Sequence, residues 1–287
     1  MPKIDLKLID EVTERLPSLP QPTLKALQLI DDPRYSARAL AEIIGVDQAL
    51  AGRLLQWANS PFYGLRYKVS TLERAIMVLG TRQIRELLMA ISVSEMLNKK
   101  MPGYGLRRGD LWRHSIAVAA GARWLANDDE YTQPEQAFIG GLLHDIGKLI
   151  MDELLCTDAS WQAEWNQLME EGASFVDLER WFTGFDHAQL GGRVAQKWNL
   201  PASLVEAITF HHDPERATIE PVITHWVHLA DSAALMLGIS LGYDGLSYVL
   251  CEESVRVTNF QALDLETLMQ VETSAVENAQ SLFMITT

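Results

Sequence analysis

Histidine and aspartate side chains are concentrated in the middle of the chain, where they could form a metal site. All seven histidines of the 287-residue sequence lie between His114 and His228. In the run 141–148, Gly-Leu-Leu-His-Asp-Ile-Gly-Lys, His144 and Asp145 are adjacent. A neutral imidazole nitrogen and an anionic carboxylate oxygen together suit a divalent transition metal. The sequence therefore predicts a metal site that uses this pair.

Other residues of the same types recur at spacings that place them on one helix face or at a helix end. Residues three or four apart share a helix face. The pairs are Asp110 with His114 and His228 with Asp231, together with Asp186-His187 at a predicted helix start and His211-His212 at a predicted helix end. Lys148, three residues after Asp145, could pair with that carboxylate or contact a phosphate oxygen.

The elements that must position these residues are helices. Apolar residues recur at i, i+3, i+4 and i+7 through most of the sequence, and alternating runs typical of strands are scarce. We therefore predict an all-α protein. In the second half the predicted helices cover about 109–127, 133–155, 160–171, 174–183, 187–199, 201–212 and 218–240.

A proline- and glycine-containing stretch, residues 99–105, is the clearest boundary signal in the chain. It predicts an N-terminal helical lobe over residues 1–102 and a second helical lobe over 103–243. The remaining residues, 244–287, are acidic and are expected to form one or two covering helices.

Composition and charge exclude several classes of protein. Hydrophobic residues make up 48% and charged residues 22%, and no apolar run is long enough to cross a bilayer. The N-terminus lacks the apolar core of a signal peptide, and two cysteines are too few for a disulfide framework, so we expect a reduced, cytoplasmic environment.

The net charge of −14 divides into +3 over residues 1–100 and −17 over 101–287. The acidic second half disfavours nucleic acid and anionic membranes as partners.

One segment of the slightly basic first half is a candidate for DNA binding. Residues 36–58 imitate a helix-turn-helix with Gly45 at the turn, but the second helix offers only Arg53 as a basic residue. Two packed structural helices are the favoured interpretation, and DNA binding is the weaker alternative.

The ordered series of ligands resembles the HD superfamily of metal-dependent phosphohydrolases. That resemblance implies metal ligands at His114, His144, Asp145 and Asp231. The further positions resemble the HD-GYP branch, which implies additional ligands at His187, His211, His212 and Asp110 and one or two ions of Fe, Mn or Zn. Residues 213–216, Asp-Pro-Glu-Arg, replace the Gly-Tyr-Pro segment of that branch. This departure counts against cyclic-di-GMP hydrolysis by that branch's mechanism.

Motifs over about residues 10–240 are more similar to the HDOD family of HD-related output domains. They are Leu-Pro-Ser-Leu-Pro at 16–20, Ala-Asn-Ser-Pro-Phe-Tyr-Gly at 58–64, Ala-Ile-Met-Val-Leu-Gly at 75–80, the run 141–148, Asp-His-Ala-Gln-Leu-Gly at 186–191 and Trp-Asn-Leu-Pro at 198–201. The resemblance implies a two-lobed helical fold whose second lobe is an HD-like bundle. It also implies a bacterial signal-transduction output module that acts by contact with a signalling protein.

Two interpretations of the site stay open at this point. His144 and Asp145 either hold a metal in a structural or sensing role, or form a metal-free polar core. The alternative function is a metal-dependent phosphohydrolase acting on a nucleotide or cyclic dinucleotide, in which Asp145 and Lys148 would be catalytic. His225 and His228 have no counterpart in the superfamily pattern, and a core or surface role is expected for His225.

Overall fold

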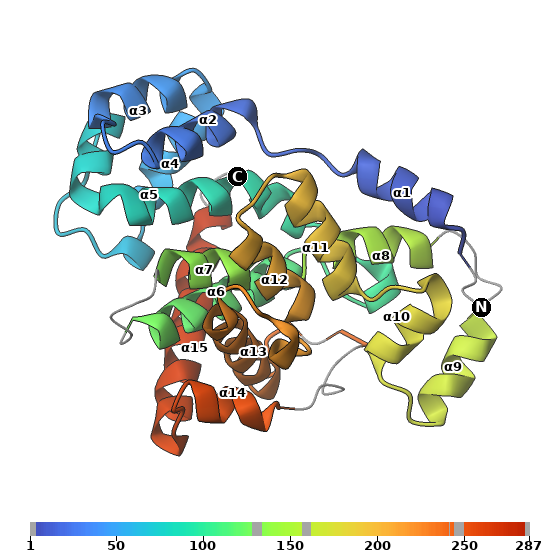
Figure 1. Cartoon of the computed structure of the whole chain (residues 1–287). Coiled ribbons are helices and arrows are strands. Elements are labelled where there is room, and N and C mark those ends of the chain that lie inside the picture. The colour runs from blue at the N-terminus through green and yellow to red at the C-terminus, as the bar shows by residue number, and fades with distance from the viewer. Residues whose placement is uncertain (1–3, 128–133, 157–161, 241, 244–249, 285–287) are drawn as a thin grey trace. The chain divides into compact units, whose positions relative to one another are not determined.

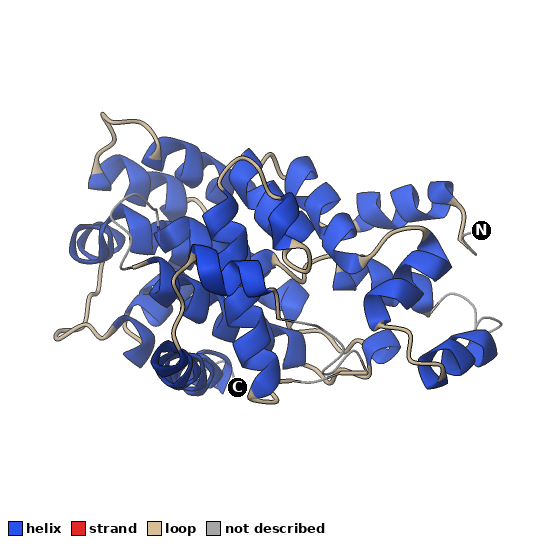
Figure 2. Ribbon diagram, turned by 60° about the horizontal axis from the view of Figure 1, so that its bottom comes forward, coloured by secondary structure: helices blue, strands red, loops and turns tan. Residues whose placement is uncertain are grey.

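The computed structural model consists of helices joined by turns and loops (Figures 1 and 2). It describes the whole chain except residues 1–3, 128–133, 157–161, 241, 244–249 and 285–287. No β-strand occurs among the described residues, which contain one isolated antiparallel bridge between Met101 and Leu106. The predicted all-α fold is confirmed. None of the described helices is both long and apolar enough to span a membrane.

The α-helices are, in chain order, α1 Leu6–Arg15, α2 Gln21–Ile30, α3 Ala37–Gly45, α4 Gln48–Ala58, α5 Leu72–Leu97, α6 Asp110–Ala126, α7 Pro134–Leu143, α8 Lys148–Leu155, α9 Gln162–Glu170, α10 Phe175–Thr183, α11 His187–Lys197, α12 Ala202–Phe210, α13 Pro221–Met236, α14 Glu252–Val257 and α15 Ala262–Met284. Short 3₁₀ helices cover η1 Pro61–Tyr63, η2 Pro102–Tyr104 and η3 Pro214–Arg216. Helix α5 is interrupted at Gly80, whose φ of 77° and ψ of 169° lie outside the helical region.

The chain folds into two compact units. One comprises residues 1–18 and 96–273, and the other comprises residues 19–95 and 274–287. Residues 4–18 thus belong to the unit that contains most of the second half. The division into an N-terminal lobe over 1–102, an HD-like lobe over 103–243 and a covering C-terminal segment over 244–287 stays a prediction.

Helices α6, α7 and α13 form the centre of the larger unit (Figure 1). Small residues let their backbones approach closely. A Cβ atom added at Gly141 of α7 would lie 2.8 Å from the carbonyl oxygen of Val118 in α6. A Cβ atom at Gly140 would lie 3.2 Å from Val227 in α13. The close packing leaves most residues of α6 and α13 buried, so the buried polar residues on these helices face other protein groups and not bulk water.

One predicted helix is wrong in a way that matters for the site. The sequence pattern predicts a single helix over 133–155, but the structure breaks it into α7 and α8 with a turn at residues 144–147. Gly147 in this turn lies directly against the backbone of α11, where a Cβ atom would overlap the carbonyl oxygen of His187. The turn therefore places His144 and Asp145 between helices and not on a continuous helical face.

Candidate metal centre

Seven of the eight predicted ligands converge inside the larger unit. His114 comes from α6, His144 and Asp145 from the turn after α7, His187 from the start of α11, His211 and His212 from the end of α12, and Asp231 from α13. Three sets of their donor atoms each lie within 4.8 Å of one another: His114, His144 and Asp145; His144, His211 and Asp231; and His187, His211 and His212. These sets are buried except for His212, which is half-buried.

The first part of the cluster is built around His114 and His144. The Nε2 atom of His114 lies 3.0 Å from Oδ1 of Asp231 and 3.3 Å from Nε2 of His144. Oδ2 of Asp145 lies 3.4 Å from His144 Nε2 and 3.6 Å from His114 Nε2. Two imidazoles and two carboxylates thus converge from three separate segments of the chain.

The second part contains the three histidines His187, His211 and His212. The Nε2 atoms of His187 and His212 are 2.9 Å apart. The second carboxylate oxygen of Asp145, Oδ1, lies 3.2 Å from His187 Nε2 and 4.0 Å from His211 Nε2. Asp145 therefore lies between the two parts and directs one oxygen toward each.

Backbone carbonyls fix the orientation of two of the rings. His144 Nδ1 donates to the carbonyl oxygen of Gly141 at 2.7 Å, and His211 Nδ1 donates to that of Ile208 at 2.8 Å. A carbonyl oxygen can only accept, so the proton is on Nδ1 in both rings. In the neutral form, each Nε2 then carries a lone pair directed into the cluster, as a metal ligand requires.

Glu179 fixes the third ring. Its carboxylate, at the inner face of α10, accepts from the backbone N–H of His187 at 2.8 Å and from His187 Nδ1 at 2.8 Å. It also accepts from the hydroxyl of Tyr104, and both Glu179 and Tyr104 are fully buried. A carboxylate paired with the outer nitrogen of a histidine increases the basicity of the inner nitrogen.

The start of α11 is held by a capping box. Asp186 accepts from the backbone N–H of Gln189 at 2.7 Å, and the Gln189 side chain accepts from the backbone N–H of Asp186. Arg180 of α10 also donates from Nε to Asp186 at 2.8 Å. These contacts fix the first residue of the helix, His187, within the cluster.

The charges within the cluster shift the pKa values in opposite directions. Burial by itself lowers the pKa of His144, but Asp145 and Asp231 outweigh it and raise the pKa to about 9. Burial likewise lowers the pKa of His187, but Glu179 and Asp145 raise it to about 10. Burial and the neighbouring charged histidines hold the pKa of His211 well below its usual range.

A narrow cavity reaches the cluster on the side of Lys148. It is bordered by His114, Asp145, Lys148 and by Leu106, Leu111, Leu235 and Ser240, with a volume of about 10 Å³. That volume corresponds to about one water molecule. Lys148 Nζ lies 2.8 Å from Oδ2 of Asp145, so the lysine lines this entrance cavity as the partner of this carboxylate.

A comparison with family models assigns residues 16–214 to the HDOD domain. The chain belongs to the HDOD family. The matched segment includes every one of the predicted metal ligands except Asp231, and the expected resemblance is confirmed.

Individual relatives of this HDOD protein are distant. An uncharacterized protein of Treponema pallidum (strain Nichols) is 26% identical over 222 residues, which cover 75% of this chain and 41% of the relative. The chain thus spans less than half the length of that curated relative. A crystal structure from Shewanella amazonensis SB2B, provisionally named a phosphohydrolase, has a TM-score of 0.73 at 24% identity and covers 96% of this chain and 98% of its own. A protein of Marinobacter aquaeolei VT8, provisionally named a signal transduction protein, has a TM-score of 0.71 at 18% identity, with coverages of 97% and 64%. At these identities the two solved structures show a shared fold.

The donor set of the HDOD cluster fits a divalent transition metal. His211 Nε2 is buried and has no hydrogen-bond partner within the described part of the chain. The Nε2 atoms of His187 and His212 lie 2.9 Å apart. Because Nδ1 of His187 bonds to Glu179, Nε2 is the nitrogen of this ring that is directed into the cluster. The converging imidazole and carboxylate groups, together with the unpaired Nε2 of His211, could hold a metal.

Asp110 lies at the start of α6 and makes contacts of its own. Its carboxylate accepts from the backbone N–H of Arg107 at 2.6 Å and pairs with the guanidinium of Arg113. It is not part of the three sets of converging donor atoms. The ligand role expected for Asp110 therefore stays a prediction.

The two remaining histidines have other partners. His225 Nδ1 lies 2.8 Å from the hydroxyl of Ser254, within the core. His228 donates from Nδ1 to the carbonyl oxygen of His211 at 2.8 Å and accepts at Nε2 from the backbone N–H of Cys251 at 2.9 Å. Both ring nitrogens of His228 are thus in use, and this side chain positions the backbone of His211.

Proposed function

We propose that this HDOD protein is a bacterial signal-transduction output module that acts by contact with a signalling protein. Its histidine and aspartate cluster would bind one or two Fe, Mn or Zn ions in a structural or sensing role. The small size of the cavity beside the cluster supports a structural or sensing role over turnover of a nucleotide. A cavity of about 10 Å³ admits roughly one water molecule, whereas a nucleotide needs a pocket of several hundred Å³.

Each part of the cluster has a defined role in this proposal. His114, His144, Asp145 and Asp231 would hold one ion, and His187, His211 and His212 a second, with Asp145 between them. A bound divalent ion would supply positive charge that links segments more than 100 residues apart in sequence. Glu179 and the carbonyls of Gly141 and Ile208 keep the inner nitrogen of each ring available for binding.

The test combines metal analysis with activity. Protein purified without a histidine tag should contain stoichiometric Fe, Mn or Zn. His144→Ala and Asp145→Ala should each abolish that metal content, whereas His225→Ala should retain it. Retention of metal in both site variants would refute the metal centre, and equal loss in all three would refute the ligand assignment.

A metal-dependent phosphohydrolase acting on a nucleotide or cyclic dinucleotide is the second candidate. The position of Lys148 at the entrance, beside Asp145 and His114, favours it, because a lysine there could contact a phosphate oxygen. Protein supplied with Mn or Fe should show no turnover of cyclic dinucleotides or phosphate esters if the first proposal is right. Turnover that is lost in Asp145→Asn would favour the phosphohydrolase.

The expected partners and location belong to the same proposal. Arg53, the basic residue of α4, pairs with Glu95, which supports a packing role for residues 36–58 and not DNA binding. Both cysteines, Cys156 and Cys251, are free thiols, consistent with the proposed cytoplasmic location. A nucleotide remains a candidate regulatory ligand, and no membrane partner is proposed.

A further inference from the structure

Helix α12 has two apolar faces, and one of them is open at the surface. Ser203, Leu204, Ala207 and Ile208 on the inner face are buried. On the outer face, Ala202, Val205, Thr209 and Phe210 follow the spacing i, i+3, i+7, i+8, so they form one stripe along the helix. The outer face of a surface helix is ordinarily charged, and this one carries a single charged residue, Glu206.

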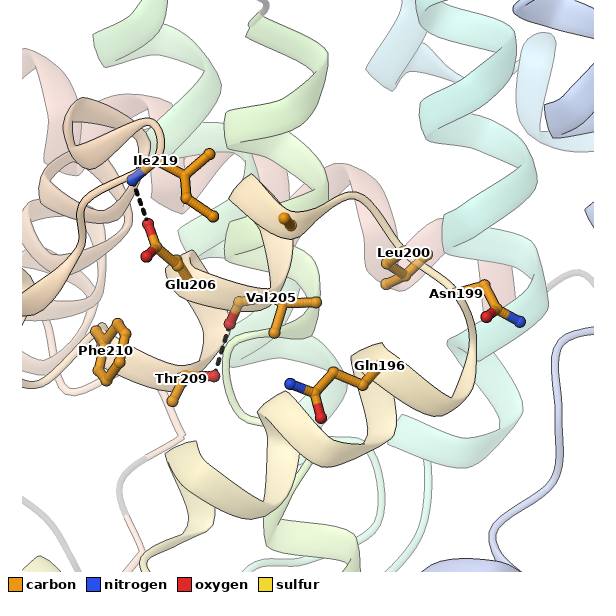
Figure 3. Close-up of a pocket in the computed structure, with 9 residues that line it drawn as sticks. Gln196, Asn199, Leu200, Val205, Glu206, Thr209, Phe210 and Ile219 are labelled. Carbon is orange, nitrogen blue, oxygen red and sulfur yellow. Dashed lines mark hydrogen bonds between the residues drawn. The ribbon is translucent and has the colours of Figure 1, made fainter.

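This stripe forms one wall of a groove of about 580 Å³. The other lining residues are Gln196, Asn199, Leu200 and Ile219, from α11, the turn after it and the loop before α13 (Figure 3). The Ile219 side chain is 54% exposed. The nine residues of α12 span about 13 Å at 1.5 Å per residue, so the groove is long enough for about two turns of a second helix.

Glu206 supplies a fixed negative charge on the groove wall. Its carboxylate accepts from the backbone N–H groups of Thr218 and Ile219 at 2.8 and 2.7 Å and from the Thr218 hydroxyl at 2.9 Å. Within the described part of the chain, no lysine or arginine forms an ion pair with it. The carboxylate is thus held in place by neutral donors and keeps its charge available to a partner.

The two helices beside the groove also carry the three histidines of the cluster. Helix α11 begins at His187 and its last turn lines the groove, while α12 ends immediately before His211. The helices form an antiparallel hairpin so tight that a Cβ atom on Gly192 would overlap the side chain of Thr209. A partner bound along the outer face would therefore contact the same hairpin that holds His187, His211 and His212.

We propose that this groove is the docking site for an amphipathic helix of a partner protein that carries lysine or arginine beside its apolar face. Leucine-like side chains would pack on Val205, Ile219 and the edge of Phe210, whose ring face is covered by the Arg216 guanidinium 4.7 Å from its centroid. A cation of the partner would meet Glu206. The net charge of −17 over residues 101–287 would also attract such a basic segment as it approaches the protein. This proposal rests on the proposed function, because it names the surface through which output by protein contact occurs.

The test uses a defined probe, a fluorescein-labelled helical peptide with leucines at i, i+3, i+4 and i+7 and lysines beside them. A matched peptide has glutamates in place of the lysines. Anisotropy titrations with the full chain should show binding of the lysine peptide roughly tenfold or more tighter than the glutamate peptide. Amide hydrogen exchange on the complex should show protection within residues 196–219.

Variants locate the binding. Val205→Asp should weaken binding of the lysine peptide roughly tenfold or more, because it places a charge in the apolar stripe. Ile219→Asp, at a more exposed position, is the second groove variant if Val205→Asp lowers the melting temperature. Leu263→Asp is the matched control, since Leu263 is an apolar residue that is 77% exposed outside the groove lining, and it should bind as the unmodified chain does. Glu206→Gln should remove most of the preference for lysine over glutamate.

Several results would overturn the proposal. The first is an unchanged affinity for the lysine peptide in both groove variants. The second is a loss of affinity in Leu263→Asp as large as that in the groove variants. The third is an undiminished preference for the lysine peptide in Glu206→Gln. A concentration-dependent dimer in sedimentation velocity that Val205→Asp disrupts would assign the groove to a second copy of this chain instead. Peptide binding is measured separately from metal content and turnover, so a failure here is distinguishable from a failure of the proposed function.

Discussion

Glu179 bonds to both the backbone N–H and the ring Nδ1 of His187, and it does so from a fully buried position. It is not itself in the cluster, yet it determines which nitrogen of His187 faces the cluster. The same carboxylate accepts from Tyr104, whose ring lies 5.4 Å below the Lys148 ammonium group. One buried acid thus connects the three-histidine part of the cluster with the entrance beside Lys148.

Glu179→Gln should therefore weaken metal binding at His187, His211 and His212. The amide loses the charge that increases the basicity of His187, and partners of this kind typically contribute 10- to 100-fold in metal affinity. Competition titrations with a metal indicator should resolve a loss of about that size at one site per chain. Tyr104→Phe is the matched control, because it leaves both Glu179–His187 bonds in place and should have the smaller effect. Equal affinities for all three proteins would contradict the role assigned to Glu179.

Gly147→Ala should destabilise the fold and disrupt the cluster. The added Cβ atom would overlap the carbonyl oxygen of His187, which is backbone and cannot rotate away. Overpacking of this kind costs about 3 kcal/mol, and urea denaturation would measure it. Gly52→Ala in α4 is the matched control, since nothing lies within 4 Å of its added Cβ atom and alanine favours a helix. A stability loss of the same size in Gly52→Ala would show that the contact with His187 is not the cause.

Glu272 should make the protein less stable as the pH rises above the ordinary pKa of glutamate. Its side chain, on α15, is fully buried, and neither carboxylate oxygen has a hydrogen-bond partner within the described part of the chain. Burial, together with the charge of Asp231, raises the pKa of Glu272 well above its usual value of 4.5. The folded state therefore keeps this proton after the unfolded state has lost it.

The sign of the pH effect follows from that difference. Because the folded-state pKa is raised, the full stability from Glu272 is present below pH 4.5 and is lost as the pH rises through the folded-state pKa. The loss is about 1.4 kcal/mol per pH unit between the two pKa values. Glu272→Leu should flatten this dependence in urea denaturation and raise stability at pH 8. A parallel pH dependence in the variant would show that Glu272 is ionised in the folded protein.

Removal of metal should loosen the larger unit. An ion bound by His114, Asp145 and Asp231 stabilises the folded state by about 2.7 kcal/mol when free metal is 100-fold above its Kd. Chelation should therefore lower the melting temperature by several degrees, at about 2–4 °C per kcal/mol for a unit of this size. It should also speed proteolysis near residues 99–105, which join α5 to α6. Unchanged melting and cleavage would show that no metal acts as a clamp.

Residue chemistry in the sequence predicted a metal site at His144 and Asp145, and the resemblance to the HD superfamily added His114, His187 and Asp231 as ligands. Helical periodicity predicted α6, α11 and α13, the helices that carry these three residues. The break at residues 144–147 could not be predicted in this way, because the apolar pattern continues through it and the cause is the contact of Gly147 with His187 of α11, 40 residues further on. Tertiary contacts also define the roles of Glu179, Tyr104 and His228. The pattern offers no local signal for them beyond the placement of Glu179 eight residues before His187.

The hairpin of α11 and α12 has a consequence for how such a protein can vary over generations. Gly192 and Thr209 lie so close that the two helices cannot shift independently, and the hairpin presents surface side chains on one side and His187, His211 and His212 at its open end. Substitutions on the surface side and substitutions near the histidines will therefore be epistatic, with combined effects that differ from the sum of the single effects. If the proposed metal centre and the proposed docking groove are both present, a lineage that acquires a new partner through this surface inherits an altered metal affinity along with it.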